Sequence, residues 1–293
     1  MNVPPISTPI DRPPSALIKR VRHGMAKIGS CGPVAGLSAA RHAGGDPRPG
    51  EAGRRSMVMP RHFGILVPST NTTCEIEFRR LPPDLQVHAA RLGKGGDTPF
   101  SPSLDADVAY QSKLLGNARV EAIALAQTSA SLFADDYDAV TVKRMTEASG
   151  VPSLTSAQAI GRALRALGAS RIAMATPYSP DVIERAKRYY ESKYGIAVVA
   201  AESLGGVDAY AIGKMDAGMA QAAFARIDRA EIEALAVPGG NFPTLDWIAS
   251  WERQFGKPVI TTNQAALWAV LRAMGISKPL PDWGRLLARM PSG

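Results

Sequence analysis

The sequence predicts an α/β protein made of two pseudo-symmetric halves, each a parallel sheet flanked by helices, with a site in the cleft between the halves. Three observations support this fold class. Short apolar segments alternate with helical patterns, the arrangement occurs twice along the chain, and small polar residues follow several of the apolar segments. Short apolar strands that alternate with helices are typical of a parallel sheet covered on both faces.

The individual elements are predicted from their apolar period and their boundaries. Six short segments rich in aliphatic residues are predicted as strands, and in chain order they are 62–68, 120–126, 170–177, 196–203, 232–238 and 257–262. Four longer segments have a helical period, and they are 104–118, 156–168, 179–195 and 262–275. Glycine ends some of these helical segments, as expected where a helix stops.

The chain also resembles itself at a spacing of roughly 110 residues. The matching pairs are 63–75 with 172–184, 121–131 with 231–241, and 155–160 with 261–266. Their offsets are 109, 110 and 106 residues, and the pairs occur in the same order. This repetition predicts two halves of similar topology, at about 60–168 and 169–293. The alternative is the general likeness of all βα units.

The first 58 residues differ from the rest and are predicted to lie outside the folded domain, which spans 59–293. They are rich in Pro, Gly, Ala and Arg and show no sustained apolar period. Such a segment cannot bury enough apolar surface to offset the entropy lost on ordering. Three explanations stay open: a disordered basic tail, a targeting peptide without the apolar core of a secretory signal, or translation from a misassigned start, with the true start at Met57 or Met59.

Charge and cysteine content exclude several classes of protein. The 293-residue chain has a formal net charge of +8, but residues 1–60 hold nine Lys and Arg against three Asp and Glu, while the remainder holds 25 against 23. A nearly neutral folded part argues against a nucleic-acid partner, and no apolar run reaches the ~18 residues of a membrane span. Cys31 and Cys74 are too few for a disulfide framework, so a cytoplasmic setting is expected. A homo-oligomer stays possible.

Small polar residues follow four of the predicted strands, where the chain turns toward a helix. These sets are 69–72, 127–129, 178–179 and 239–241. Ligands of open α/β sheets bind at the carboxyl ends of the strands, and helix N-termini offer unpaired N–H groups to anions. One such residue is commonly an ordinary helix cap, but four symmetric sets predict a cleft for a small carboxylate or related polar metabolite. Gln127 is the least cap-like, since a long amide behind a buried strand needs a hydrogen-bond partner.

Five segments carry a resemblance to a known group of enzymes. They are VPSTNTTCEIEF (67–78), TSASL (128–132), ATPYSPDV (175–182), NFPTLDWI (241–248) and GKPVITTNQAALWAVLRAMG (256–275). The sequence from about Phe63 to the end resembles the branch of the aspartate/glutamate racemase superfamily that contains the maleate isomerases and arylmalonate decarboxylases. The resemblance implies two pseudo-symmetric α/β halves with the site between them, which agrees with the internal repeat.

The resemblance also implies thiol chemistry, for which this sequence lacks the expected residues. Paired cysteines flank the substrate carbon in the racemases and maleate isomerases, and the decarboxylases keep one. The family pattern places them where this chain has Gln127 and Gly239, and neither an amide nor a glycine is a general base near neutral pH. Cys74 is the only cysteine after residue 58 and is expected to behave as a small buried hydrophobe. The alternative is a relocated nucleophile.

These positions define the predicted site. Tyr178, Ser129 and Gln127 are predicted as catalytic residues, although a phenol starts near pKa ~10 and needs surroundings that lower this value. The predicted substrate-binding residues are Ser69, Asn71, Thr128, Gly239, Gly240 and Asn241. No metal or organic cofactor is implied. We expect an isomerase or decarboxylase-like lyase that acts on a small carboxylate without the paired cysteines. The alternatives are a non-catalytic metabolite-binding protein, or a thiol-independent lyase or hydrolase with a water held by Gln127 and Asn241.

Overall fold

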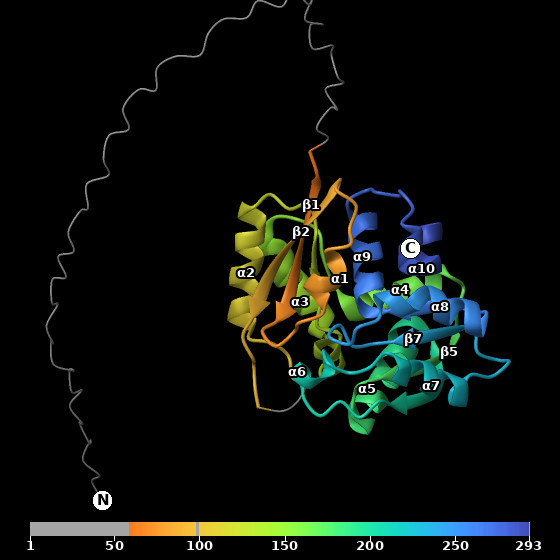
Figure 1. The fold of residues 1–293 in the computed structure, drawn as a ribbon. Helices are drawn as coiled ribbons and strands as arrows, with labels where there is room; N and C mark the ends of the chain where they lie inside the picture. Colours follow the sequence, from red (N-terminus) through yellow and green to blue (C-terminus); the bar gives the residue numbers. More distant parts are fainter. Residues whose placement is uncertain (1–58, 98–99, 293) are drawn as a thin grey trace, which may run out of the picture. The chain divides into compact units, whose positions relative to one another are not determined.

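Two parallel four-stranded sheets form the part of the chain that the computed structural model describes, residues 59–97 and 100–292 (Figure 1). The predicted extension at 1–58 lies outside the described residues. The first sheet has the order β2-β1-β3-β4 and the second the order β6-β5-β7-β8, so both halves share one topology. The predicted fold class is therefore confirmed. The strands are β1 (Arg61–Pro68), β2 (Leu85–Leu92), β3 (Ile123–Leu125), β4 (Ser153–Thr155), β5 (Arg171–Thr176), β6 (Ala197–Ser203), β7 (Ala234–Val237) and β8 (Val259–Thr261).

Helices follow the strands in both halves and connect parallel neighbours, as parallel pairing requires. The helices of the first half are α1 (Cys74–Phe78), α2 (Asp105–Asn117), the 3₁₀ turn η1 (Thr128–Leu132), α3 (Tyr137–Ser149) and α4 (Ser156–Ala166). Those of the second half are α5 (Pro180–Tyr194), α6 (Ala209–Ile212), α7 (Gly218–Ile227), α8 (Leu245–Phe255), α9 (Thr262–Ala273), η2 (Pro281–Trp283) and α10 (Gly284–Arg289).

The two faces of the first sheet contribute to different cores. Leu66 and Ile123 project from β1 and β3 into a cluster with Leu115 of α2 and Met145 of α3. The opposite face joins a larger core that continues into the second half, where α4 packs against α9. The predicted apolar strands are thus largely buried on both faces, except for the half-buried edge strand β6, and the two halves share one continuous interior.

Capping fixes where α4 and α9 begin, directly after β4 and β8. Thr155 accepts a hydrogen bond from the Gln158 amide at 3.2 Å, and the Gln158 side chain accepts one from the Thr155 amide at 3.2 Å. In the second half the Thr261 amide donates to Gln264 Oε1 at 3.2 Å. A threonine followed three residues later by glutamine is a capping-box sequence, and its recurrence brings the first turns of α4 and α9 to matching positions.

Strand pairing shows that the offset between one pair of equivalent segments is two residues larger than predicted. Gly64 of β1 lies beside Ile123 of β3, and Ala173 of β5 lies beside Leu235 of β7. Gly64 and Ala173 are separated by the predicted 109 residues, so the equivalents Ile123 and Leu235 are separated by 112 rather than the predicted 110. A shift of two keeps every side chain on its own face of the sheet, and the apolar pattern therefore does not detect it.

Candidate functional site

A cavity of about 390 Å³ lies at the carboxyl ends of β1, β3, β5 and β7. All nine predicted site residues line it, namely Ser69, Asn71, Gln127, Thr128, Ser129, Tyr178, Gly239, Gly240 and Asn241. The structure thus brings together residues from both halves, although their catalytic and binding roles stay predictions. The other polar or aromatic residues of the lining are Thr70, Lys94, Asp97, Phe100, Ser101, Ser103, Asp208 and Tyr210.

A chain of buried hydroxyl groups forms the floor of the cavity and crosses from one half to the other. The Thr128 hydroxyl is hydrogen-bonded to Ser156 Oγ at 2.9 Å and to Thr262 Oγ1 at 3.1 Å. Ser156 and Thr262 are the first residues of α4 and α9, which explains their matching positions. The Gly239 amide donates to Thr262 Oγ1 at 2.9 Å. This network holds Thr128 in place before any ligand binds.

Tyr178 is buried beside this floor, with 3% of its surface exposed. Burial raises the pKa of its phenol, and a hydrogen bond with Thr128 offsets only part of that increase. Proton abstraction near neutral pH requires a lowered pKa, and the surroundings of Tyr178 raise the pKa instead. The phenol stays protonated and can donate a hydrogen bond or a proton, but it is a poor general base.

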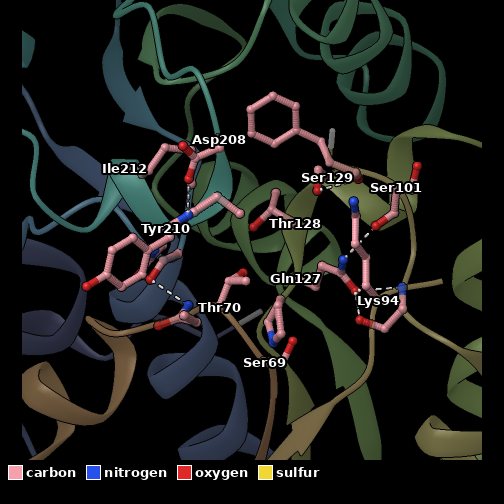
Figure 2. Close-up of a pocket in the computed structure, with 18 of the residues that line it drawn as sticks. Ser69, Thr70, Lys94, Ser101, Gln127, Thr128, Ser129, Asp208, Tyr210 and Ile212 are labelled. Carbon is pink, nitrogen blue, oxygen red and sulfur yellow. Dashed lines mark hydrogen bonds between the residues drawn. The ribbon is translucent and has the colours of Figure 1, made fainter. Parts of the chain in front are cut away.

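Gln127 and Ser129 direct their side chains to the segment 100–103. Gln127 Oε1 accepts hydrogen bonds from the Ser103 amide at 3.1 Å and the Ser103 hydroxyl at 2.8 Å. Gln127 Nε2 donates to the Ser101 carbonyl at 2.9 Å (Figure 2). The Ser129 hydroxyl donates to the Phe100 carbonyl at 2.9 Å. The partner that the sequence predicted for the Gln127 amide is thus a neighbouring stretch of the chain.

Asn71 and Asn241 line the cavity, yet they use their amides to join the two halves. Asn71 Oδ1 accepts from the Thr73 and Cys74 amides, each at 3.0 Å, and its Nδ2 donates to the Gly240 carbonyl at 3.2 Å. Asn241 Oδ1 accepts from the Thr72 amide at 2.8 Å and from the Thr73 amide at 3.1 Å. Both side chains therefore shape the cavity wall, with most of their hydrogen-bonding atoms already engaged.

Gly239 adopts a backbone conformation that favours glycine, with φ at +133°. A Cβ atom added there would lie 2.9 Å from Cγ and 3.0 Å from Cδ of Pro177. The corrected register makes Gly239 the equivalent of Gln127, at the end of the corresponding strand. Both positions at which the resemblance predicts cysteine are thus occupied by residues with structural duties of their own.

Cys74 lies outside the cavity lining and is fully buried. It is the first residue of α1. A helix N-terminus ordinarily lowers a thiol pKa, but burial, reinforced by the Glu77 and Glu75 carboxylates, raises the pKa of Cys74 well above its ordinary value. The thiol is neutral and inaccessible, as expected of a small buried hydrophobe.

The sequence analysis missed the charged residues of the cavity. Lys94 and Asp97 belong to a glycine-rich stretch after β2. Its glycine content was the only feature of the sequence that could have pointed to these two residues, and the stretch matches no phosphate-binding motif. Asp208 caps α6 by accepting from the Tyr210 and Ala211 amides, each at 2.8 Å.

Across residues 59–97 and 100–292, no three His, Cys, Asp or Glu side chains gather as a metal site requires. In the same residues no helix is long and apolar enough to cross a membrane.

Comparison with known proteins identifies the family to which the chain belongs. The sequence profile of the arylmalonate decarboxylase family matches residues 63–287. The chain belongs to the arylmalonate decarboxylase family. It is 30% identical over 229 residues to the arylmalonate decarboxylase of Bordetella bronchiseptica, a match that covers 76% of this chain and 95% of the relative.

Solved structures of maleate isomerases share the fold. A cysteine-to-alanine variant of the Pseudomonas putida enzyme, solved with maleate, superposes with a TM-score of 0.71 at 26% identity, covering 78% of this chain and 98% of that one. A Nocardia farcinica maleate cis-trans isomerase variant, which holds a covalently bound succinylcysteine intermediate, superposes with a TM-score of 0.66 at 26% identity, covering 79% and 99%. The family assignment made from the sequence is confirmed.

Proposed function

We propose that the protein binds a small carboxylate in this cavity and acts on it without paired cysteines, as a decarboxylase-like lyase. One observation carries the proposal: the cavity of a family member is lined by hydroxyl, phenol and amide groups together with Lys94, Asp97 and Asp208, whereas the one thiol in the described residues is buried elsewhere. This lining favours chemistry that relies on hydrogen-bond donors. Of the family's reactions, loss of carbon dioxide depends on such donors most directly.

Isomerisation of maleate needs a nucleophile that adds to the double bond and allows rotation. The succinylcysteine in the Nocardia farcinica variant is an adduct of this kind. Among the described residues that line this cavity no cysteine or histidine is present. The hydroxyls of Thr128 and Ser129 are hydrogen-bonded to two other hydroxyls and to a backbone carbonyl, and none of these groups is a general base. Isomerisation through an adduct is therefore disfavoured.

Decarboxylation requires a different kind of assistance. The bond between the α-carbon and one carboxylate breaks, carbon dioxide leaves, and the electron pair moves into the remaining carboxylate to give an enediolate. The enediolate then takes one proton at carbon. Preorganised donors aimed at the developing oxyanions stabilise this charge.

The cavity offers such donors in its own residues. The first amide of η1 bonded to a backbone carbonyl is that of Ala130, which donates to Gln127 O at 3.2 Å. The Thr128 and Ser129 amides precede it and have no backbone partner within the described chain. The Tyr178 phenol stays protonated because burial raises its pKa. We assign Thr128 and Ser129 to the carboxylate oxygens, and Tyr178 to hydrogen-bond donation or proton delivery.

Two alternatives are open. A metabolite-binding protein without turnover would use the same donors. A hydrolase with a water held by Gln127 and Asn241 is disfavoured, because both amides bond the chain itself and an amide cannot deprotonate water.

The test combines turnover with binding. The purified protein is incubated with phenylmalonate, malonate and maleate, carbon dioxide release and products are followed by NMR, and binding is measured by calorimetry. We expect carbon dioxide from at least one malonate, no fumarate, and a loss of activity of about 10²-fold or more in Tyr178→Phe. Tyr110→Phe, at an exposed position on α2, is the matched control. Binding without carbon dioxide release would identify a sensor, and rapid fumarate formation would contradict the proposal.

A further inference from the structure

We propose that Gln127 is a positioning residue that fastens the segment 100–103 to the end of β3 and so builds one wall of the cavity. The fastening is a property of the folded chain and is independent of the reaction. Its effect on ligand binding rests on the proposed function. Gln127 is the residue found where the resemblance predicts a cysteine.

The side-chain hydrogen bonds of Gln127 that the structure shows all lead to this segment. Its Oε1 accepts from the amide and the hydroxyl of Ser103, and its Nε2 donates to the Ser101 carbonyl. Figure 2 shows the Gln127 side chain reaching toward Ser101 at the edge of the pocket. Ser129, two residues on, adds the bond to the Phe100 carbonyl. Four hydrogen bonds from two residues thus hold three residues of the segment.

Glutamine suits this task better than any residue of similar size. The side chain must accept from an N–H and an O–H on one side and donate to a carbonyl on the other. Glutamate provides the acceptors without the donor, and a thiol offers only weak hydrogen bonding. Methionine has a similar length but makes none of the three bonds. A cysteine at position 127 would therefore leave the segment without its main attachment.

The attachment of the segment positions two further side chains of the cavity wall, Phe100 within the segment and Lys94 beside it. The Phe100 ring meets the Tyr178 ring edge to face, with centroids 5.3 Å apart. Ser103 also forms an antiparallel bridge with Lys94, the one basic residue among the described cavity lining. Gln127 therefore acts on the ligand through Phe100 and Lys94, by setting the wall that faces Tyr178. This makes it a specificity-determining residue rather than a catalytic one.

Amide hydrogen exchange tests the fastening directly, because the Ser103 amide is itself bonded to Gln127. We expect Gln127→Met to speed exchange at Ser103 by about tenfold or more, which corresponds to ~1.4 kcal/mol, since the amide and the hydroxyl of Ser103 both lose their acceptor and local opening becomes easier. Gln127→Glu keeps the acceptors and should lie between wild type and Gln127→Met. Gln254→Ala, an exposed position on α8, should change nothing. Unchanged exchange at Ser103 in folded Gln127→Met would overturn the proposal.

Binding of phenylmalonate, measured by calorimetry on the same variants, separates this inference from the proposed function. Faster Ser103 exchange together with weaker binding by about tenfold supports both. Faster exchange in a protein that binds no phenylmalonate even as wild type supports the fastening and counts against the function. Loss of turnover in Gln127→Met with unchanged Ser103 exchange would show that Gln127 contacts the substrate, which overturns the positioning role.

Discussion

Removal of the Glu77 carboxylate should loosen the junction between the two halves. Glu77 lies in α1 with 6% of its surface exposed. Its Oε1 accepts from the Thr244 and Leu245 amides at 2.7 and 2.9 Å, at the start of α8. Its Oε2 accepts from Asn263 Nδ2 at 2.7 Å. Asn263 Nδ2 also donates to the Gly240 carbonyl at 3.1 Å, so the carboxylate is two hydrogen bonds from the cavity wall.

The expected cost follows from the donors that Glu77→Ala leaves without a partner. Three buried N–H groups at roughly 1–1.5 kcal/mol each give a loss of about 3–5 kcal/mol in the free energy of unfolding. For a domain of this size each kcal/mol lowers the melting temperature by roughly 2–4 °C. Glu77→Gln keeps an acceptor for the two amides but turns an NH₂ group toward Asn263, so it should cost less, about 1–2 kcal/mol.

Glu75→Ala is the matched control, since it removes a carboxylate from the same helix. Glu75 pairs with Arg91 through side chains that are 38% and 45% exposed, and such a pair contributes at most ~1 kcal/mol. Urea unfolding followed by circular dichroism compares the variants. Equal stability of Glu77→Ala and Glu75→Ala would refute the reasoning.

The pH dependence gives a second measurement on Glu77. Burial raises the pKa of the Glu77 carboxyl, although its four hydrogen bonds oppose the increase. The folded state therefore binds the proton more tightly than the unfolded state, whose pKa is about 4.3. The resulting stability is fully present below that pH and is lost as the pH rises through the higher folded value. The deficit of Glu77→Gln relative to wild type should thus shrink between pH 4 and pH 7, and a deficit that grows would show a lowered folded pKa.

Three further predictions concern the cavity and the thiols. Iodoacetamide should leave Cys74 unmodified in the folded protein and Cys74→Ser should retain most activity, because the thiol is buried and neutral; mass spectrometry and turnover check this. Asn241→Ala should weaken ligand binding by about tenfold in calorimetry while the protein stays folded, because the bonds of Asn241 to the Thr72 and Thr73 amides shape the cavity wall. Unaltered binding would contradict that role. Gly239→Ala should lower the free energy of unfolding by about 1–3 kcal/mol, and an unchanged urea midpoint would show that the backbone relaxes at no cost.

The sequence predicted the fold through segments whose burial is uniform, and it missed those whose burial is mixed. The six predicted strands correspond to β1, β3, β5, β6, β7 and β8. β2 was not predicted, because it lies at the edge of the sheet and exposed or half-buried residues interrupt its apolar ones. β4 is only three residues long, and α3 mixes polar with apolar residues and buries few side chains. Tertiary packing, which a single-sequence pattern does not report, decides such elements.

The location of the site was easier to predict than the behaviour of its residues. Polar residues after apolar strands are a local signal, and all nine predicted positions line one cavity. The direction of the Tyr178 pKa shift depends on burial contributed by both halves. The partners of Gln127 lie 24 and 26 residues away along the chain. Effects that depend on such distant neighbours cannot be derived from the strand end alone.

The surroundings of positions 127 and 239, where the resemblance predicts thiols, show why substituting cysteines there should not by itself give isomerisation. At position 127 the substitution removes three hydrogen bonds to the segment 100–103. At position 239 it introduces a Cβ atom against Pro177 at a φ of +133°, a strain of order 1–3 kcal/mol. Thiolate catalysis needs a sulfur held in one place beside the substrate carbon, and here each new sulfur would disturb the wall that should hold it. Positions 127 and 239 are therefore tied into the cavity wall, and the proposed chemistry should be sought among reactions that hydrogen-bond donors can assist.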